Sequence, residues 1–124
     1  MTLHNPALGV GLHIADVQVY NAAAPVAWTD LDLSAVVGTG RPALVMLKVK
    51  IATNGSDIGF RRKGDTDDFF FTVGANGSQG ASMVSGVDVA TWYTVFVCTD
   101  INGVIQICAD AAEATLIDVM AWLA

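Results

Sequence analysis

The chain has 124 residues, of which 53% are hydrophobic and only 15% are charged, and its formal net charge is −6. This length suits one domain with a sizeable core, and the negative balance argues against a nucleic-acid partner, which needs a basic stripe. An average globular domain is roughly 25% charged, so much of this surface is either neutral or buried against other copies or a partner. We expect burial in an assembly.

No run of about 18 apolar residues that could span a bilayer is present, so we expect no membrane partner. The N-terminus lacks the charged and apolar regions of a secretory signal. We therefore expect a soluble protein that is not exported.

Residues 1–11, MTLHNPALGVG, contain a proline and two glycines and show no periodicity. We interpret them as an extended N-terminal arm ahead of a single domain at 12–124. Apolar residues are unusual in an unattached tail, so Leu3, Leu8 and Val10 are expected subunit contacts. The alternative is that the arm crosses the surface of its own domain.

The segment from Leu12 to Tyr20 carries Ile14, Val17 and Val19 with Asp16 and Gln18 between them, which predicts a first strand. A loop at 21–25 follows, because Pro25 excludes more than a turn of helix. Val26 to Leu33 predicts a short edge strand, and 37–42 a turn.

The segment from Ala43 to Thr53, ALVMLKVKIAT, is apolar on both sides at its start and alternates with lysines from Lys48 onward. Alternation with β-branched residues on one side is typical of a half-buried strand. The change of pattern predicts that both faces are covered in the first half, at Leu44 and Met46. In the second half, one face is expected to lie in water.

Downstream, short apolar segments recur every 8–12 residues with turn signals between them, which is typical of an antiparallel sandwich or barrel. The last segment, 114–123, also fits one face of a helix, but we favour a strand that closes the sandwich. The predicted fold class is therefore all-β, an antiparallel β-sandwich of about eight short strands. The downstream strands are expected at 58–62, 68–73, 81–85, 91–99, 104–109 and 114–123.

Two cysteines, Cys98 and Cys108, lie on consecutive predicted strands. An Asn102-Gly103 hairpin turn would pair Cys98 with Ile107 and place Cys108 on the other face, so no disulfide is expected. The same register would gather Phe96, Cys98, Ile105 and Ile107 on one apolar face. Both thiols are expected to be buried, and without a nearby histidine they make no metal site.

A basic run at 61–63 leads directly into Asp65, Asp67 and Asp68. Three carboxylates with Thr66 could bind calcium, but the spacing does not match an EF-hand loop. We prefer a charge-balanced turn and expect no metal and no cofactor.

Asp30 and Asp32 lie on one face of a predicted strand, at a spacing that a glycosidase pair could use. A chain this short rarely forms a deep sugar cleft, so we expect a solvent-facing edge and no enzyme activity. His4 and His13 have no partners at the spacing of a catalytic triad or a metal site.

Aromatic residues could form a platform for sugar rings, and Trp28 and Trp92 are the candidate ligand platform, with Tyr93 and Trp122 as further members. Aromatic residues on strands belong more often to a core than to a platform. A glycan ligand is therefore the alternative expectation.

Three segments together resemble the small β-sandwich proteins encoded among tailed-phage structural genes. They are VYNAAAPVAWTDLDLS at 19–34, RPALVMLKVK at 41–50, and FRRKGD at 60–65. The resemblance is one of pattern and covers most of the chain after the arm. It implies a jelly-roll-like sandwich, usually trimeric, with no catalytic residues.

From these observations we expect a non-enzymatic virion structural protein, assembled in the host cytoplasm. Its role would be that of a capsid decoration (cement) protein that acts as an oligomer, with a trimer favoured and other virion proteins as partners. The alternative is a carbohydrate- or receptor-binding module of a phage tail fibre or surface protein.

Overall fold

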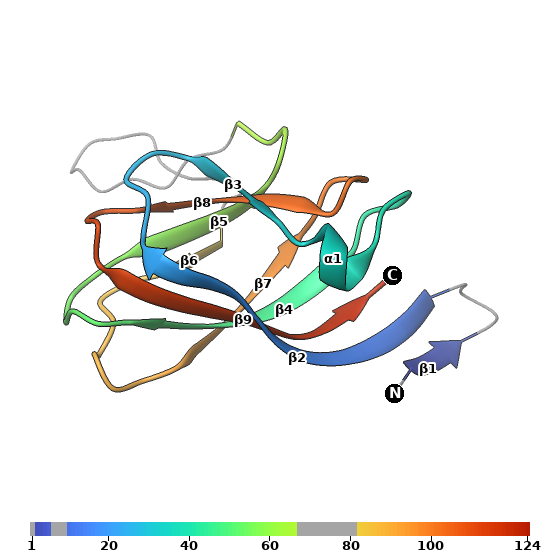
Figure 1. Cartoon of the computed structure of the whole chain (residues 1–124), viewed down its shortest axis with the longest axis horizontal. Helices are drawn as coiled ribbons and strands as arrows, with labels where there is room; N and C mark the ends of the chain where they lie inside the picture. Colours follow the sequence, from blue (N-terminus) through green and yellow to red (C-terminus); the bar gives the residue numbers. More distant parts are fainter. Residues whose placement is uncertain (1, 6–9, 67–81) are drawn as a thin grey trace.

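The computed structural model describes residues 2–5, 10–66 and 82–124 of the chain. Within these residues the chain forms nine strands and one four-residue helix, arranged as two sheets packed face to face (Figure 1). Neighbouring strands pair antiparallel in both sheets. The prediction of an all-β antiparallel sandwich is confirmed.

The larger sheet has five strands in the order β1-β2-β9-β4-β7. These are β1 (Thr2–Asn5), β2 (Val10–Ala23), β9 (Ala114–Leu123), β4 (Leu44–Ile51) and β7 (Tyr93–Cys98).

The smaller sheet has four strands in the order β3-β8-β5-β6. These are β3 (Thr29–Asp32), β8 (Val104–Ala109), β5 (Ile58–Arg62) and β6 (Ser82–Val84). The helix α1 (Ser34–Val37) follows β3 directly, and no helix in the described part of the chain has the length and hydropathy to cross a membrane.

The strand order is that of a jelly roll. The first four strands of the roll, β2 to β5, pair with the last four in reverse order, β9 to β6. The resulting pairs are β2–β9, β3–β8, β4–β7 and β5–β6. This long ribbon then wraps so that β4 also pairs with β9, and β5 with β8. Each of the two sheets therefore has four strands of the roll, and β1 adds a fifth to the larger sheet.

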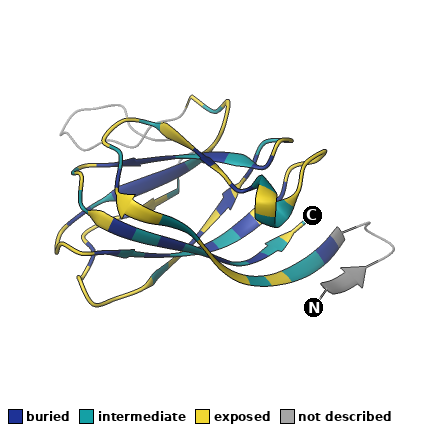
Figure 2. Cartoon of the chain, in the orientation of Figure 1, coloured by how far each residue is buried: buried dark blue, intermediate teal, exposed yellow. Residues whose placement is uncertain are grey.

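The core lies between the facing surfaces of the two sheets, and buried positions alternate with more exposed ones along β4 and β9 (Figure 2). This alternation is the period of two that the sequence predicted for β4. The largest fully buried side chains are those of Phe60, Leu33, Leu47, Ile51, Ile58, Ile105, Ile107 and Ile117.

A β-bulge changes which residues of β9 face outward. Val119 pairs with Leu47, whereas Ala121 pairs with Met46, so Met120 is an extra residue on β9. Beyond the bulge, Ala121 and Leu123 share the face of Met46 and Leu44, because one extra residue shifts the following side chains to the opposite face. Strict alternation along 114–123 would place Ala121 and Leu123 on the same face as Val119, and the bulge overturns this arrangement.

The predicted hairpin at Asn102-Gly103 is a connection between the sheets, because β7 and β8 on its two sides lie in different sheets. The Asn54-Gly55 turn likewise connects β4 in one sheet with β5 in the other. The predicted pairing of Cys98 with Ile107 is therefore wrong: Cys98 pairs with Leu44. A turn dipeptide reverses the chain without specifying which sheet it continues in.

Most predicted strands lie where the structure has them, including the final one, which is a strand and not a helix. The strand predicted at 68–73 lies outside the described residues. The predicted arm at 1–11 contains a strand, because β1 pairs with the start of β2. Together they extend past the end of the smaller sheet (Figure 1). The division into an arm and a domain at 12–124 stays a prediction.

Gly103 allows the turn before β8 to approach α1 closely. Its φ is +77°, and a Cβ at this position would lie 2.7 Å from the carbonyl oxygen of Gly38 and 2.9 Å from Cα of Ser34. Gly55 has nearly the same φ, +79°, but a Cβ there would meet nothing within 4 Å. Substituting each glycine by alanine therefore distinguishes the cost of backbone strain, which both positions share, from the cost of a steric clash, which only Gly103 would meet.

We predict that Gly55→Ala lowers the free energy of unfolding by about 1–2 kcal/mol, the cost of a left-handed backbone. Gly103→Ala should lower it by about 3–4 kcal/mol, because α1 must also move. Urea unfolding of the two variants measures the difference, and equal losses would contradict the close approach.

Candidate functional site

The outer face of the five-stranded sheet carries two rows of apolar side chains at one end. The strand register aligns Leu12, Leu123, Leu44 and Cys98 in one row across β2, β9, β4 and β7. The same register aligns Ile14, Ala121, Met46 and Phe96 in the next row. We call these eight residues the apolar rows.

Five of the eight residues in the apolar rows are exposed in a single chain, Leu12 and Met46 are partly buried, and Ala121 is buried among them. Phe96 is 51% exposed, Ile14 50%, and Leu44 and Leu123 38% each. A shallow groove of about 60 Å³ runs among them and is lined by Leu12, Leu44, Met46, Phe96, Ala121, Trp122 and Leu123. Single exposed apolar residues are common, but contiguous apolar patches on a small protein mark contact sites.

A polar row borders the apolar rows on the same face. Gln18, Asp118, Lys48 and Thr94 are aligned across the same four strands. The Lys48 ammonium lies 3.6 Å from Asp118 Oδ2 and 3.7 Å from Oδ1 of Asp16 in the bulge of β2. The outer face is thus divided along the strands into an apolar end and a charged end.

This division follows the pattern that the sequence showed in β4. Leu44 and Met46 point outward at the apolar end, and Lys48 and Lys50 point outward at the charged end. The prediction that the second half has one face in water is confirmed. The prediction that the first half is covered on both faces is wrong for the described part of the single chain, because Leu44 is 38% exposed and none of the described strands lies over it.

Sequence reasoning missed most of the apolar rows. Phe96 was expected on a face with Ile105 and Ile107, but those two are buried in the other sheet while Phe96 points outward. Strict alternation along the last predicted strand groups Leu123 with Val119, whereas the bulge places Leu123 on the outer face with Leu44. In the sequence, only Leu44 and Met46 at the start of β4 indicated that this face carries an apolar surface.

Trp28 and Trp92 do not form one platform. Trp28 lies against the guanidinium of Arg61 on the smaller sheet, 4.1 Å from the ring centroid. Trp92 directly precedes β7 of the larger sheet and is 40% exposed, and the ammonium groups of Lys48 and Lys50 lie 5.2 and 5.8 Å from the centroid of its ring. The two tryptophans therefore belong to opposite faces of the sandwich.

The other two aromatic candidates are held by neighbours. The Tyr93 hydroxyl accepts a hydrogen bond of 2.8 Å from the backbone N–H of Asp88. Trp122 stacks on His13, with ring centroids 4.7 Å apart, and also packs against the core. His4 lies on β1, and the structure does not describe its side chain.

Asp30 and Asp32 face outward on edge strand β3, as predicted, and each is engaged in a local contact. Asp30 is ion-paired with Lys63, and its Oδ1 accepts a hydrogen bond of 3.0 Å from Gln106 Nε2. Asp32 Oδ1 accepts a hydrogen bond of 2.9 Å from the backbone N–H of Ser34. Asp30 thus connects β3 to Lys63 and to β8, and Asp32 connects the end of β3 to the start of α1.

These contacts also set the ionisation of the two carboxylates. Hydrogen bonds from Lys63 and then Gln106 lower the pKa of Asp30 below its ordinary 3.8. Hydrogen bonds from Ser34 lower the pKa of Asp32 in the same way. A glycosidase acid needs a raised pKa, so this pair is poorly suited to hydrolysis.

The two cysteines carry thiols and form no disulfide, as expected. Cys108 is buried, which confirms half of the prediction. Cys98 is exposed on the apolar rows, so the other half is wrong.

Among the described residues, no group of three His, Cys, Asp or Glu side chains is placed to hold a metal ion. Two members of the acidic cluster, Asp67 and Asp68, lie outside the described residues, so calcium binding there stays untested. Leu8, one of the expected arm contacts, also lies outside the described residues. The other two lie on paired strands, where Leu3 is the register partner of Leu12 and Val10 is the register partner of Asn5.

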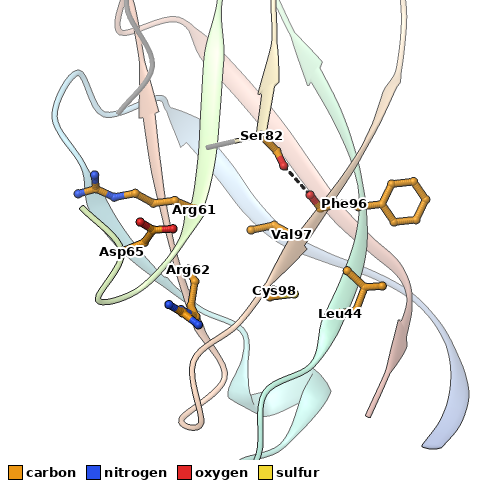
Figure 3. Close-up of a pocket in the computed structure, with 8 residues that line it drawn as sticks. All are labelled: Leu44, Arg61, Arg62, Asp65, Ser82, Phe96, Val97 and Cys98. Atoms are coloured by element: carbon orange, nitrogen blue, oxygen red, sulfur yellow. Dashed lines mark hydrogen bonds between the residues drawn. The ribbon is translucent and has the colours of Figure 1, made fainter. Parts of the chain in front are cut away.

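A cavity of about 330 Å³ lies at the open edge between the sheets, beside β5, β6 and β7. Its lining is Leu44, Arg61, Arg62, Asp65, Ser82, Phe96, Val97 and Cys98, and the Phe96 ring points away from the arginines (Figure 3). Ser82 Oγ donates a hydrogen bond of 2.8 Å to the Phe96 carbonyl oxygen and ties the sheet edges together. Residues 67–81, which connect Thr66 to Ser82 in the sequence, lie outside the described residues, and we assign the cavity no ligand.

No family model and no curated protein sequence matches the chain. Among solved structures, it is similar to the carbohydrate-binding module CBM6cm-2 from Cellvibrio mixtus lichenase 5A, solved in complex with cellotriose. The sequence identity is 14% and the TM-score 0.40, over 87% of this chain and 97% of that chain. A likeness at this level carries no conclusion about what this chain binds.

The lowered pKa values of Asp30 and Asp32 predict a loss of stability in acid. A carboxyl with a lowered pKa in the folded state stabilises the protein above its unfolded pKa, near 3.8, and the effect is lost as the pH falls through the folded value. The melting temperature of Asp30→Asn should therefore lie below that of the native protein by a constant amount above the unfolded pKa, and this difference should disappear as the pH falls through the lowered folded pKa.

Lys63→Met removes the same ion pair from its other side and serves as the matched variant. Its melting temperature should converge with that of the native protein in the same pH range. A difference that stays constant from neutral pH to pH 2 would contradict the assigned contacts.

Proposed function

We propose that this protein is a non-enzymatic structural protein that acts as an oligomer within a larger protein assembly, and that the apolar rows are a protein–protein contact on which this incorporation depends. The observation that carries the proposal is the contiguous apolar end of an otherwise polar sheet face, open in the single chain. Removing such area from water contributes roughly 25 cal/mol per Å². The low charge of the whole chain supports the same reading.

The setting that we propose is the capsid of a tailed phage, on which the protein acts as a decoration (cement) protein. The support for this finer step is the sequence resemblance to small phage β-sandwich proteins. The jelly roll is compatible with it, because viral capsid domains use this fold, but lectin domains use it too.

The test is Phe96→Glu, with Met83→Glu as the matched control on the outer face of the smaller sheet. Both side chains are about half exposed, at 51% and 42%, so neither substitution should unfold the chain. In cells that make the whole assembly, native chain and control should sediment with particle-sized material. The Phe96→Glu chain should remain in the supernatant, because a carboxylate in the contact must be desolvated.

Thermal melting checks that the Phe96→Glu chain is folded. Equal incorporation of this variant would overturn the proposed contact face. A native chain found only in the low-mass fraction would overturn the structural role.

A second candidate function is glycan binding at Trp92. The specific observation is a 40% exposed ring flanked by Lys48 and Lys50, which could stack on a sugar while the lysines donate hydrogen bonds. Lys50 also lines a groove of about 220 Å³ at the charged end of the same face. This arrangement is independent of the apolar rows.

If this candidate is right, titration with oligosaccharides should give binding that Trp92→Ala weakens at least about tenfold, the usual cost of losing a buried aromatic contact. Trp28→Phe, on the opposite face, is the control and should bind as the native chain does. No binding at millimolar oligosaccharide would exclude the glycan function.

A further inference from the structure

The apolar rows raise the question of what covers them, and this inference rests on the proposed function. The outward residues at the start of β4 have the pattern of a strand covered on both faces, yet no element of the described chain lies over them. The covering surface therefore comes from outside the described chain.

We propose that a second copy of this chain packs face to face on the apolar rows, about a two-fold axis that lies between β9 and β4 and runs parallel to them. Such a rotation keeps each residue's position along the strands and reverses the order of the strands. β2 then lies over the partner's β7, and β9 over the partner's β4.

This symmetry makes the face complementary to itself. Each apolar row meets its own counterpart, so that Leu123 lies over the partner's Leu44 and Ile14 lies over the partner's Phe96. No apolar row has to meet a polar one. The two sheets would pack in the aligned manner of a β-sandwich.

The polar row gives the charge complementarity. Asp118 is on β9 and Lys48 is its register partner on β4. The two-fold axis between these strands therefore places Asp118 opposite the partner's Lys48, and Lys48 opposite the partner's Asp118. Four charges of alternating sign then border the apolar centre, where a polar rim is expected.

A single contiguous face favours two copies. An isologous contact uses the same patch on both subunits, whereas a cyclic trimer needs two different patches that fit each other. The apolar rows form one patch on one sheet. The inference thus differs from the trimer that the sequence resemblance implied.

The size of the patch sets the strength of the contact. With strands ~4.8 Å apart and same-face residues ~6.7 Å apart, eight positions cover roughly 250 Å² of sheet. Stable interfaces bury roughly 800 Å² on each partner, so the apolar rows would form the centre and the polar row part of the rim. We expect a dimer that dissociates on dilution.

The test exchanges the charges of the polar row one at a time. Lys48→Glu alone and Asp118→Lys alone each place like charges across the axis, so each should weaken the dimer at least about tenfold. A mixture of the two variants should dimerise to within about threefold of the native chain, because every charge then faces an opposite one across the contact.

Rescue on mixing distinguishes a loss of the contact between chains from a change in structure within each chain. In both variants the internal pair of residues 48 and 118 stays repulsive, so only contacts between chains can be restored by mixing. Met83→Glu, on the other sheet, is the control and should dimerise as the native chain does. Sedimentation equilibrium measures the masses, and low salt sharpens the contrast.

A native chain that is monomeric or trimeric at every concentration would overturn the inference, and so would a mixture without rescue. Incorporation of the same chains into particle-sized material separates this result from the proposed function. Incorporation without a dimer leaves the structural role standing, whereas a dimer without incorporation overturns that role and keeps the two-fold contact.

Discussion

The strict alternation of β4 is the constraint on which the rest of the structure depends. Val45, Leu47, Val49 and Ile51 are at most 1% exposed between the two sheets. Because successive side chains of a strand point to opposite faces, burying these four forces every residue between them to the outside. β4 lies between β9 and β7, so it also aligns their outward residues through the ladder.

The division of the outer face into an apolar end and a charged end follows the outward side chains of β4. Where the outward residues of β4 are Leu44 and Met46, the residues aligned with them across the sheet are apolar too. At Lys48, the aligned residues are Asp118, Gln18 and Thr94. The bulge at Met120 is what brings Leu123 into the apolar end. β4 thus contributes to the core on one side and to the proposed contact on the other. The carboxylates of β3, in contrast, make local contacts with neighbouring residues of the smaller sheet and of α1.

Local pattern predicted the strands well, and β5 has the predicted bounds, because alternation and turn residues act within a few positions. The partners of each strand were not predictable, because a turn such as Asn102-Gly103 is compatible with a hairpin and with a crossing between sheets. This is why Cys98 was paired with the wrong strand. The bulge on β9 left no local signal, so only Leu44 and Met46 pointed to the contact face, and the residues across the sheet required the register.

The most direct measurement of whether a second copy covers the apolar rows is the reaction rate of Cys98 with a small disulfide reagent at increasing protein concentration. Cys98 is exposed next to Leu44 in the first apolar row, whereas Cys108 is buried and should react only on unfolding. The account predicts that the rate falls as the dimer forms, with the midpoint at its dissociation constant. A rate that stays constant up to millimolar protein would contradict it.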